Sequence, residues 1–296
     1  MPAVADLRRR IANIRNVRQL ARAMKAVAAA RLARARAAAA AARPYAGEIG
    51  GLLARLAAAP GIEHPLLLPP GAPAPAGRRC LLVIAGDRGL AGGFNAAVVR
   101  AALDMQKARE GGGPAPAFIA VGRRAVTALR FRGADLRETF TGLDDPVPPE
   151  LSRAVAARLL DGLAAGEFAA VDLVYNRFVS VLVQRPAVEP LLPVVPPAPE
   201  DVERRKGPQP LYIVEPSPQE VLGELVPAYV TARVHRALAE SRAGEHAARM
   251  AAMDAAVRNA GEAVDRLTRE LSRRRQQAIT MEILDIVGGA AAIDNR

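Results

Sequence analysis

Apolar residues near the C-terminus follow a seven-residue repeat that predicts one long helix. In the proline-free stretch 228–296 the spacing alternates between three and four residues, at Met250, Met253, Val257, Ala260, Val264, Leu267, Leu271, Arg274, Ala278 and Met281. Arg274 interrupts this otherwise apolar series. A period of 3.5 residues keeps one seam of a helix against a partner helix, so the pattern indicates a coiled coil. A helix of about 60 residues would be about 90 Å long, more than a domain core of this size requires.

The N-terminal segment has a matching pattern and is the natural partner. Apolar residues there step by three to five positions, at Leu7, Ile11, Ile14, Val17, Leu20, Met24, Val27 and Leu32. We expect this helix to continue past Pro44 to about Ala59, and the C-terminal helix to begin after LYIVEPSP. The pattern therefore predicts an antiparallel coiled coil between segments 1–59 and 211–296.

The middle of the chain, 78–207, alternates between strand and helix patterns. RRCLLVIAG and APAFIAVG are typical of buried strands, and two β-rich runs surround Asn176. Helical patterns follow the glycine-rich segment GDRGLAGGF, cover Arg123–Phe131, and cover Leu151–Ala165. This alternation predicts an α/β sheet with helices on its faces.

Composition agrees with a helix-rich protein that has a slim core. Apolar residues make up 51% of the chain and aromatic residues 3%, and much of the apolar share is alanine. The sequence has no run of 18 apolar residues, and we expect neither a membrane span nor a signal peptide. Cys80 is the single cysteine, which excludes a disulfide within the chain, and we expect it to be a small buried apolar residue.

The positive charge is concentrated at the N-terminus. The chain carries +11 overall, and residues 1–45 hold eleven basic residues against the single acid Asp6, a net +10. Such a helix favours an acidic partner, whether nucleic acid, lipid or protein. No aromatic residue lies in its first 44 positions to stack on bases, so we prefer arginines on the outer face of a coiled coil and keep a basic coiled-coil nucleic-acid-binding protein as the alternative.

Few residues suggest chemistry. Gly86, Gly89 and Gly92 are spaced G-x-x-G-x-x-G, which differs from the dinucleotide and P-loop patterns, so we expect a structural turn in which Asp87 and Arg88 face each other or a neighbouring subunit. The histidines His64, His235 and His246 lack metal-ligand spacing, and Asp144 and Asp145 are expected to be solvated loop carboxylates. We therefore predict no catalytic residue, no cofactor site and no metal site. A Rossmann-type enzyme with helical arms stays open and would require saturable nucleotide binding.

Both ends of the chain resemble the gamma subunit family of F-type ATP synthases. The similarity lies in IANIRNVRQLARAMKAVAAARLARA at the start and in RRQQAITMEILDIVGGAAA at the end. The segments GDRGLAGGFN, YNRFVSVL and LYIVEPSPQEVL resemble the same family in the same order. The resemblance covers essentially the whole chain. It implies an antiparallel coiled coil of the terminal helices, with a Rossmann-like α/β domain inserted between them.

The resemblance also implies a function and partners. A member of this family is a non-catalytic rotor subunit of the central stalk, which transmits torque between a proton-driven ring of c subunits and a catalytic ring of alpha and beta subunits. Its expected partners are the alpha, beta, epsilon and c-ring subunits, with delta in the same complex, and no nucleic acid. The expected place is the cytoplasmic face of a bacterial inner membrane, as a peripheral subunit held through the c ring.

Particular residues match the family's contact positions. By resemblance, Met24 and Lys25 lie near an acidic lever of the beta subunits, and Arg275 and Gln276 match a pair that hydrogen-bonds a beta-subunit loop. The resemblance also implies an apolar tip that sits in a bearing, made by Ile283, Ile286, Val287 and Ile293. The seam of the coiled coil is expected at Met250, Met253, Val257, Val264, Leu267, Leu271 and Met281.

Overall fold

The computed structural model describes residues 2–57, 64–69, 71–73, 75–108, 113–196 and 214–294. They form two compact units, one of residues 28–249 and one that joins 1–27 to 250–296. The helices are α1 (Pro2–Ala57), α2 (Phe94–Lys107), α3 (Arg123–Phe131), α4 (Pro149–Ala164) and α6 (Pro218–Asp294). The strands are β1 (Arg79–Ile84), β2 (Ala117–Val121), β3 (Leu136–Phe140), β4 (Ala170–Phe178) and β5 (Gln184–Leu192). The predicted division into 1–59, 78–207 and 211–296 stays a prediction; both terminal segments contribute to both units.

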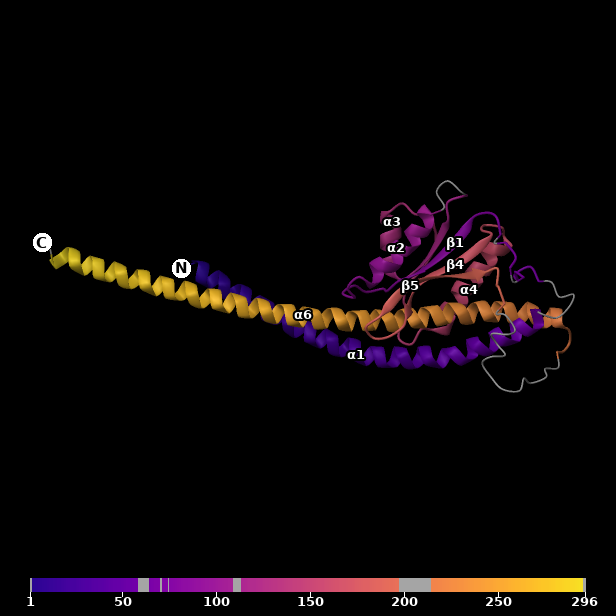
Figure 1. The fold of residues 1–296 in the computed structure, drawn as a ribbon, viewed down its shortest axis with the longest axis horizontal. Helices are drawn as coiled ribbons and strands as arrows, with labels where there is room; N and C mark the ends of the chain where they lie inside the picture. The colour runs from indigo at the N-terminus through magenta and orange to yellow at the C-terminus, as the bar shows by residue number, and fades with distance from the viewer. Residues whose placement is uncertain are drawn as a thin grey trace. The chain divides into compact units, whose positions relative to one another are not determined.

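Unit 28–249 is built on a five-stranded sheet in the order β3-β2-β1-β4-β5. Figure 1 labels β1, β4 and β5 of this sheet. Strands β1 to β4 are parallel neighbours, and β5 pairs with β4 in the antiparallel sense. The order 3-2-1-4-5 is that of a doubly wound nucleotide-binding sheet, which is the Rossmann-like arrangement expected. The two β-rich runs are β4 and β5, and Asn176 lies within β4, so the turn between them is Val179–Val183 rather than at Asn176.

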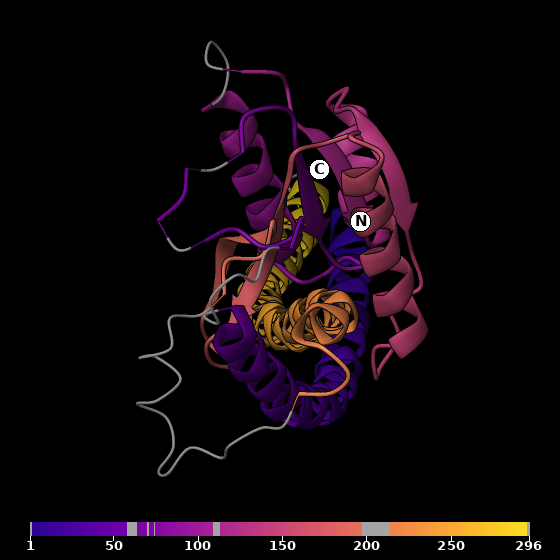
Figure 2. The ribbon, with the colours of Figure 1, turned by 90° about the vertical axis from the view of Figure 1, so that its right-hand side faces the viewer.

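The two faces of the sheet have separate cores because successive side chains of a strand point to opposite faces. On one face, Leu81, Val83 and Phe118 pack with residues of α2 and α3. On the other, Leu82, Ile119 and Leu173 pack with residues of α4, α6 and α1. Within this unit α6 lies between α1 and the sheet, and Figure 2 shows it surrounded when viewed end-on. Every α6 residue from 237 to 247 is buried as a result.

Gly122, between β2 and α3, is a position where only glycine fits. Its φ is +93°, and a Cβ added there would lie 2.1 Å from the carbonyl oxygen of Ala85. We expect Gly122→Ala to lower the free energy of unfolding by about 3 kcal/mol or more, because it adds a backbone clash to the strain of a left-handed conformation. Urea unfolding of the two proteins measures the difference.

Gly142 provides the matched control for that substitution. Its φ of +86° is nearly the same, but no atom lies within 4 Å of the Cβ position. Gly142→Ala should cost about 1 kcal/mol, from strain alone. Equal losses in the two variants would show that the clash with Ala85 carries no weight.

Helix α6 begins where its sequence provides a cap. The Ser217 hydroxyl accepts a hydrogen bond from the Glu220 backbone N–H (3.3 Å) and donates one to the Glu220 carboxylate (2.9 Å), with Pro218 as the first helical residue. Serine followed by proline and a glutamate three residues later is a preferred start of a helix. The expected start after LYIVEPSP is therefore confirmed. The helix continues through Pro227, whose carbonyl accepts a hydrogen bond from the Thr231 hydroxyl (2.9 Å).

In the other unit, the two chain ends run side by side in opposite directions. Lys25 Nζ lies 2.5 Å from Asp254 Oδ1, and the Arg18 guanidinium carbon lies 3.6 Å from the Cβ position of Gly261. As the residue number rises along α1 it falls along α6, so the pairing is antiparallel. The same register places Pro2 level with about residue 277. Beyond that point α6 has no α1 residue opposite it.

The α1 seam differs from the predicted one. The buried side chains Leu7, Ile11, Ala21, Ala28, Leu32, Ala35 and Ala39 follow a three-and-four spacing that also passes through Ile14, Arg18 and Lys25. Val17, Leu20 and Val27 were expected in the seam but are 53–61% exposed. The prediction was wrong for these three because it followed the largest apolar residues. Alanines occupy the seam instead, which lets the helices approach closely.

The predicted α6 seam is buried only in part. Met253 and Val264 are buried, together with Ala260, whereas Met250, Val257, Leu267 and Leu271 are half-buried. Met281 was expected in the seam and is 61% exposed, because it lies beyond the level of Pro2, the first residue of α1. Arg274 is exposed and lies 3.4 Å from Glu270 on its own helix, so it is not an intruder in a packed seam.

Candidate functional site

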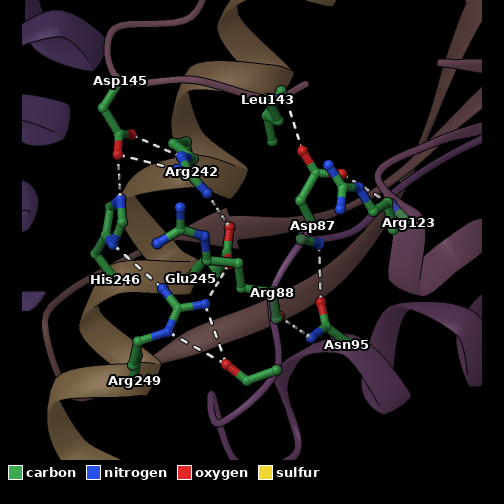
Figure 3. Close-up of polar contacts among 12 residues, drawn as sticks. Asp87, Arg88, Asn95, Arg123, Leu143, Asp145, Arg242, Glu245, His246 and Arg249 are labelled. Carbon is green, nitrogen blue, oxygen red and sulfur yellow. Dashed lines mark hydrogen bonds and ion pairs between the residues drawn. The ribbon is translucent and has the colours of Figure 1, made fainter. Parts of the chain in front are cut away.

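The glycine-rich turn after β1 ties loops together at the carboxyl edge of the sheet. The Asp87 carboxylate accepts hydrogen bonds from the backbone N–H groups of Arg123 (2.9 Å), Gly142 (3.0 Å) and Leu143 (2.8 Å). Figure 3 shows Asp87 directed at Arg123 and Leu143. The expected structural turn is thus present, but Asp87 faces the loops after β2 and β3 rather than Arg88.

The place where a phosphate would lie in a dinucleotide-binding fold is filled by the chain itself. Asn95, in the first turn of α2, accepts the Gly86 N–H through its side-chain oxygen (2.8 Å) and donates to the Arg88 carbonyl (3.3 Å). A Cβ at Gly86 would lie 2.5 Å from the carboxyl carbon of Glu245 on α6. Phosphate binding at such a turn needs free N–H groups and open space at the helix start. This geometry disfavours the Rossmann-type enzyme.

Next to the turn lies a buried ion cluster, by which we mean Asp145, Arg242, Glu245, His246 and Arg249. Arg242 bonds both Asp145 oxygens (2.6 and 3.0 Å) and one oxygen of Glu245 (2.6 Å). Arg249 bonds the other Glu245 oxygen and donates twice to the Gly89 carbonyl (3.3 Å each). These side chains are at most 10% exposed. The cluster joins α6 to two loops of the sheet (Figure 3).

His246 lies between Arg249 and Asp145 in the cluster. Its Nδ1 lies 3.3 Å from an Arg249 nitrogen, and its Nε2 lies 2.8 Å from an Asp145 oxygen. Arginine can only donate, so Nδ1 accepts this hydrogen bond, and Nε2 faces Asp145. Two arginines pair with two carboxylates around the imidazole. Buried charges paired in this way avoid the cost of an isolated ion.

The cluster predicts an acid-sensitive contribution to stability. Burial alone would raise the pKa of Asp145, but hydrogen bonds from His246 and Arg242 lower it to about 2, from an ordinary 3.8. A pKa below its unfolded value means a contribution that is complete above about pH 4 and is lost as the pH falls toward 2. As the pH falls from 6 to 2, the free energy of unfolding should decrease on the order of 1–2 kcal/mol more in the native chain than in Asp145→Asn. Parallel curves for the two proteins would contradict this assignment.

A second group of charges fastens α6 to the edge strand β5. Glu189 accepts hydrogen bonds from the Tyr175 hydroxyl (2.7 Å), Arg177 (2.5 Å) and Arg233 (2.8 Å), with Arg236 at 3.5 Å. Burial opposes ionisation of Glu189, yet these donors lower its pKa. Burial and the bond to Glu189 raise the pKa of Tyr175 to about 12. Glu189 is therefore a charged anchor for Arg233 of α6.

The remaining candidates for chemistry have structural explanations. Cys80 is buried, and burial raises the pKa of its thiol to about 12, which confirms the expected apolar role. His235 lies 2.8 Å from the Ser152 hydroxyl, and burial lowers its pKa. In the described part of the chain, no group of three or more His, Cys, Asp and Glu side chains could hold a metal ion. None of the described helices is both long and apolar enough to cross a membrane.

The predicted contact residues lie on the unit formed by the chain ends. Met24 is half-buried, and Lys25 is half-exposed and pairs with Asp254, whose pKa the hydrogen bond from Lys25 lowers. Arg275 and Gln276 are exposed. The tip residues Ile283, Ile286 and Val287 are 55–67% exposed, whereas the side chain of Ile293 lies outside the described residues.

Comparison with known proteins identifies the family. The family model described as ATP synthase matches residues 3–293. The ATP synthase gamma chain of Desulforudis audaxviator is 44% identical, and that of Pelotomaculum thermopropionicum is 43% identical. Each alignment covers 99% of this chain and 100% of the relative. The chain belongs to the ATP synthase gamma chain family.

Solved structures support the fold of this gamma chain. A chain of the Euglena gracilis mitochondrial ATP synthase (OSCP/F1/c-ring) matches with a TM-score of 0.66 at 18% identity, covering 99% of this chain and 95% of that one. A chain of the central stalk and c ring of the Tetrahymena thermophila enzyme matches with a TM-score of 0.60 at 22% identity, covering 80% and 99%. The architecture is thus shared despite low identity. The predicted fold, terminal helices around an α/β domain, is confirmed.

Sequence reasoning missed the buried ion cluster of this gamma chain. Asp145 was expected to be solvated, but it accepts three hydrogen bonds and is 10% exposed. A signal was present, because Arg242, Glu245, His246 and Arg249 occupy positions i, i+3, i+4 and i+7 in an alanine-rich stretch. This spacing places all four on one face of a helix. A polar face in the middle of a long alanine-rich helix indicates a specific partner.

Proposed function

We propose that this gamma chain is the rotor subunit of the central stalk in an F-type ATP synthase, a non-catalytic part that transmits torque between a proton-driven c ring and the catalytic alpha and beta subunits. The observation that carries the proposal is the antiparallel pairing of the two chain ends, fixed by the Lys25–Asp254 contact. Membership in the gamma chain family supports it. Two paired helices resist twisting better than one, as a shaft requires.

The partners follow from the same proposal. Alpha and beta subunits would surround the unit of chain ends, while epsilon and the c ring would contact the α/β domain, with delta elsewhere in the complex. Attachment through the c ring would make the chain a peripheral subunit at the cytoplasmic face of the bacterial membrane. The charge of +10 in residues 1–45 suits carboxylate-rich segments of the beta subunits. The comparisons give no support to the nucleic-acid-binding alternative.

The exposed residues at the end of α6 support their proposed contacts. Ile283, Ile286 and Val287 expose large apolar side chains beyond the level at which α1 ends. Apolar side chains gathered on an exposed surface are typical of an interaction site. We place the bearing tip here, including Ile293, and assign Arg275 and Gln276 to hydrogen bonds with a beta subunit. Met24 and Lys25 are assigned to the neighbourhood of its acidic lever.

Two measurements test the proposal. Alpha and beta subunits should co-purify with the tagged chain, and nucleic acid should not; the reverse result would remove the rotor function. In the assembled complex, Arg275→Ala with Gln276→Ala should reduce ATP hydrolysis several-fold, because charge-assisted hydrogen bonds to a beta subunit are lost. Arg269→Ala, which changes another exposed arginine of the same helix, should leave hydrolysis unchanged.

A further inference from the structure

Residues 239–247 of α6 bury only small apolar side chains, whereas Val230, Val234 and Leu238 are buried earlier in the helix. Ala239, Ala243 and Ala247 are buried, and Gly244 packs so closely on Phe94 that a Cβ there would lie 2.9 Å from the ring. Helices are fixed against their neighbours when side-chain ridges fill matching grooves. Methyl groups make shallow ridges, so rotation or sliding of such a segment loses little buried area. Apolar packing alone therefore specifies the position of this segment weakly.

Along residues 239–249, the buried ion cluster provides the directional contacts that the alanines lack. Nearer the start of α6, Arg233 makes a separate contact of this kind with Glu189. Arg242 reaches Asp145 in the loop before α4, and Arg249 reaches the Gly89 carbonyl in the turn after β1. These two arginines are seven residues apart, or about two helical turns, so they lie on the same side of α6. A rotation of α6 or a shift by one turn would separate both from their partners. Leaving buried charges unpaired is strongly unfavourable.

We propose that the buried ion cluster is the torque key of this protein: it locks α6 to the α/β domain in one rotational position, so that the two turn together. This inference rests on the proposed rotor function, since torque that enters at the base must pass into α6 without slip. Asp145, Arg242, Glu245, His246 and Arg249 are positioning residues. They act through the helix that they hold.

A merely stabilising role for the cluster would give a different experimental result. If the cluster only stabilised the fold, its loss would lower the amount of assembled complex, and each complex would keep its normal ratio of protons pumped to ATP hydrolysed. A torque key predicts the opposite pattern. Intact complexes would still hydrolyse ATP, but fewer protons would be pumped for each ATP.

Gly86 and Glu245 lie close enough for a disulfide between these positions to replace the ion cluster as the link between α6 and the sheet. The three atoms nearest to a Cβ at Gly86 all belong to the Glu245 carboxyl group, at 2.5–2.9 Å. Because the carboxyl carbon of glutamate is two bonds from its own Cβ, cysteines at 86 and 245 would have Cβ atoms within about 5 Å, close to disulfide geometry. Cys80 is buried and would not compete for the bond.

The test uses the complete ATP synthase in sealed vesicles, carrying Gly86→Cys with Glu245→Cys in this chain. Under reducing conditions we expect ATP hydrolysis to persist while the ratio of proton pumping to hydrolysis falls several-fold. After oxidation, with the disulfide verified by mass spectrometry, the ratio should return close to that of the native enzyme. Each single cysteine variant should show no recovery on oxidation. A normal ratio in the reduced state, or no recovery once the disulfide has formed, would overturn the proposal.

A second variant covers the case in which the double cysteine chain fails to assemble. Arg242→Met with Asp145→Leu removes the bonds of the cluster to the loop before α4 and leaves apolar side chains of similar size, a replacement that folded proteins tolerate. Assembly should be near normal and the pumping ratio several-fold lower, whereas an unchanged ratio would refute the torque key. Arg153→Met, at an exposed pair with Glu150, should change neither quantity. If the native chain did not assemble with alpha and beta subunits at all, the proposed function would fail before the key was tested.

Discussion

Asp172→Ala should lower the free energy of unfolding by about 3–5 kcal/mol, one of the two largest effects expected of a single substitution in this chain. Asp172 on β4 holds Arg79 at the start of β1 through two parallel bonds, one of them from Arg79 Nε at 2.6 Å. Both side chains are at most 10% exposed. Removing the carboxylate leaves a guanidinium buried between strands with no countercharge. Urea unfolding of the full chain gives the difference directly.

A double substitution separates the cost of an unpaired buried arginine from the net contribution of the ion pair to stability. Arg79→Met with Asp172→Leu removes both charges and retains most of the side-chain volume. The cost of desolvating a buried ion pair cancels much of the attraction between its charges. The free energy of unfolding of the double variant should therefore be within about 1 kcal/mol of that of the native chain. A double variant as unstable as Asp172→Ala would mean that the pair itself, rather than the orphaned arginine, supports the sheet.

Leu53→Asp should be at least as damaging, with an expected loss of about 4 kcal/mol or more. Leu53 lies near the end of α1, is fully buried, and belongs to the core between the sheet, α4 and α6. The substitution removes leucine packing and buries a carboxylate without a partner. We expect the full chain to unfold at much lower urea concentration or to fail to accumulate as folded protein.

Leu20→Asp is the matched control, because it makes the same change in the same helix. Leu20 is 61% exposed, so its substitution should change the free energy of unfolding by no more than about 0.5 kcal/mol. The sequence pattern placed Leu20 in the seam and would predict a large loss. A large loss of unfolding free energy for Leu53→Asp and a small one for Leu20→Asp would support the seam through Ala21 and Leu53. Large losses for both would support the predicted seam through the largest apolar residues.

The long helices and most strands could be predicted because their local signals agree with their final environment. The cap at Ser217 marks the start of α6. The heptad spacing of 250–271 reflects burial of one helix face, and the apolar runs of β1, β2 and β4 reflect burial on both faces of the sheet. Strand β3 was missed. Its sequence LRETF has no apolar alternation, because β3 is an edge strand and much of it is exposed. Pairing with β2 defines it, and pairing is a tertiary property.

The polar contacts were harder to predict for a similar reason. Asp145 follows a turn signal, and turn carboxylates are ordinarily solvated. Only the approach of Arg242, 97 residues later, buries it. In the same way, Lys25 was assigned to an external partner from its family position, and its contact with Asp254 depends on the register of two helices that a single-sequence pattern leaves open. Spacing predicts which residues share a face, but not what that face meets.

Direct observation of rotation is the most decisive measurement of the account. Phe131 on α3 is 89% exposed, and Cys80 is buried, so Phe131→Cys gives one accessible thiol for a bead. With a ring of alpha and beta subunits fixed to a surface and this chain assembled in it, ATP should drive sustained turning of the bead in one direction. Turning should stop when ATP is withdrawn. Random motion of equal extent in both directions, with ATP hydrolysis in progress, would contradict the claim that this chain is a rotating shaft.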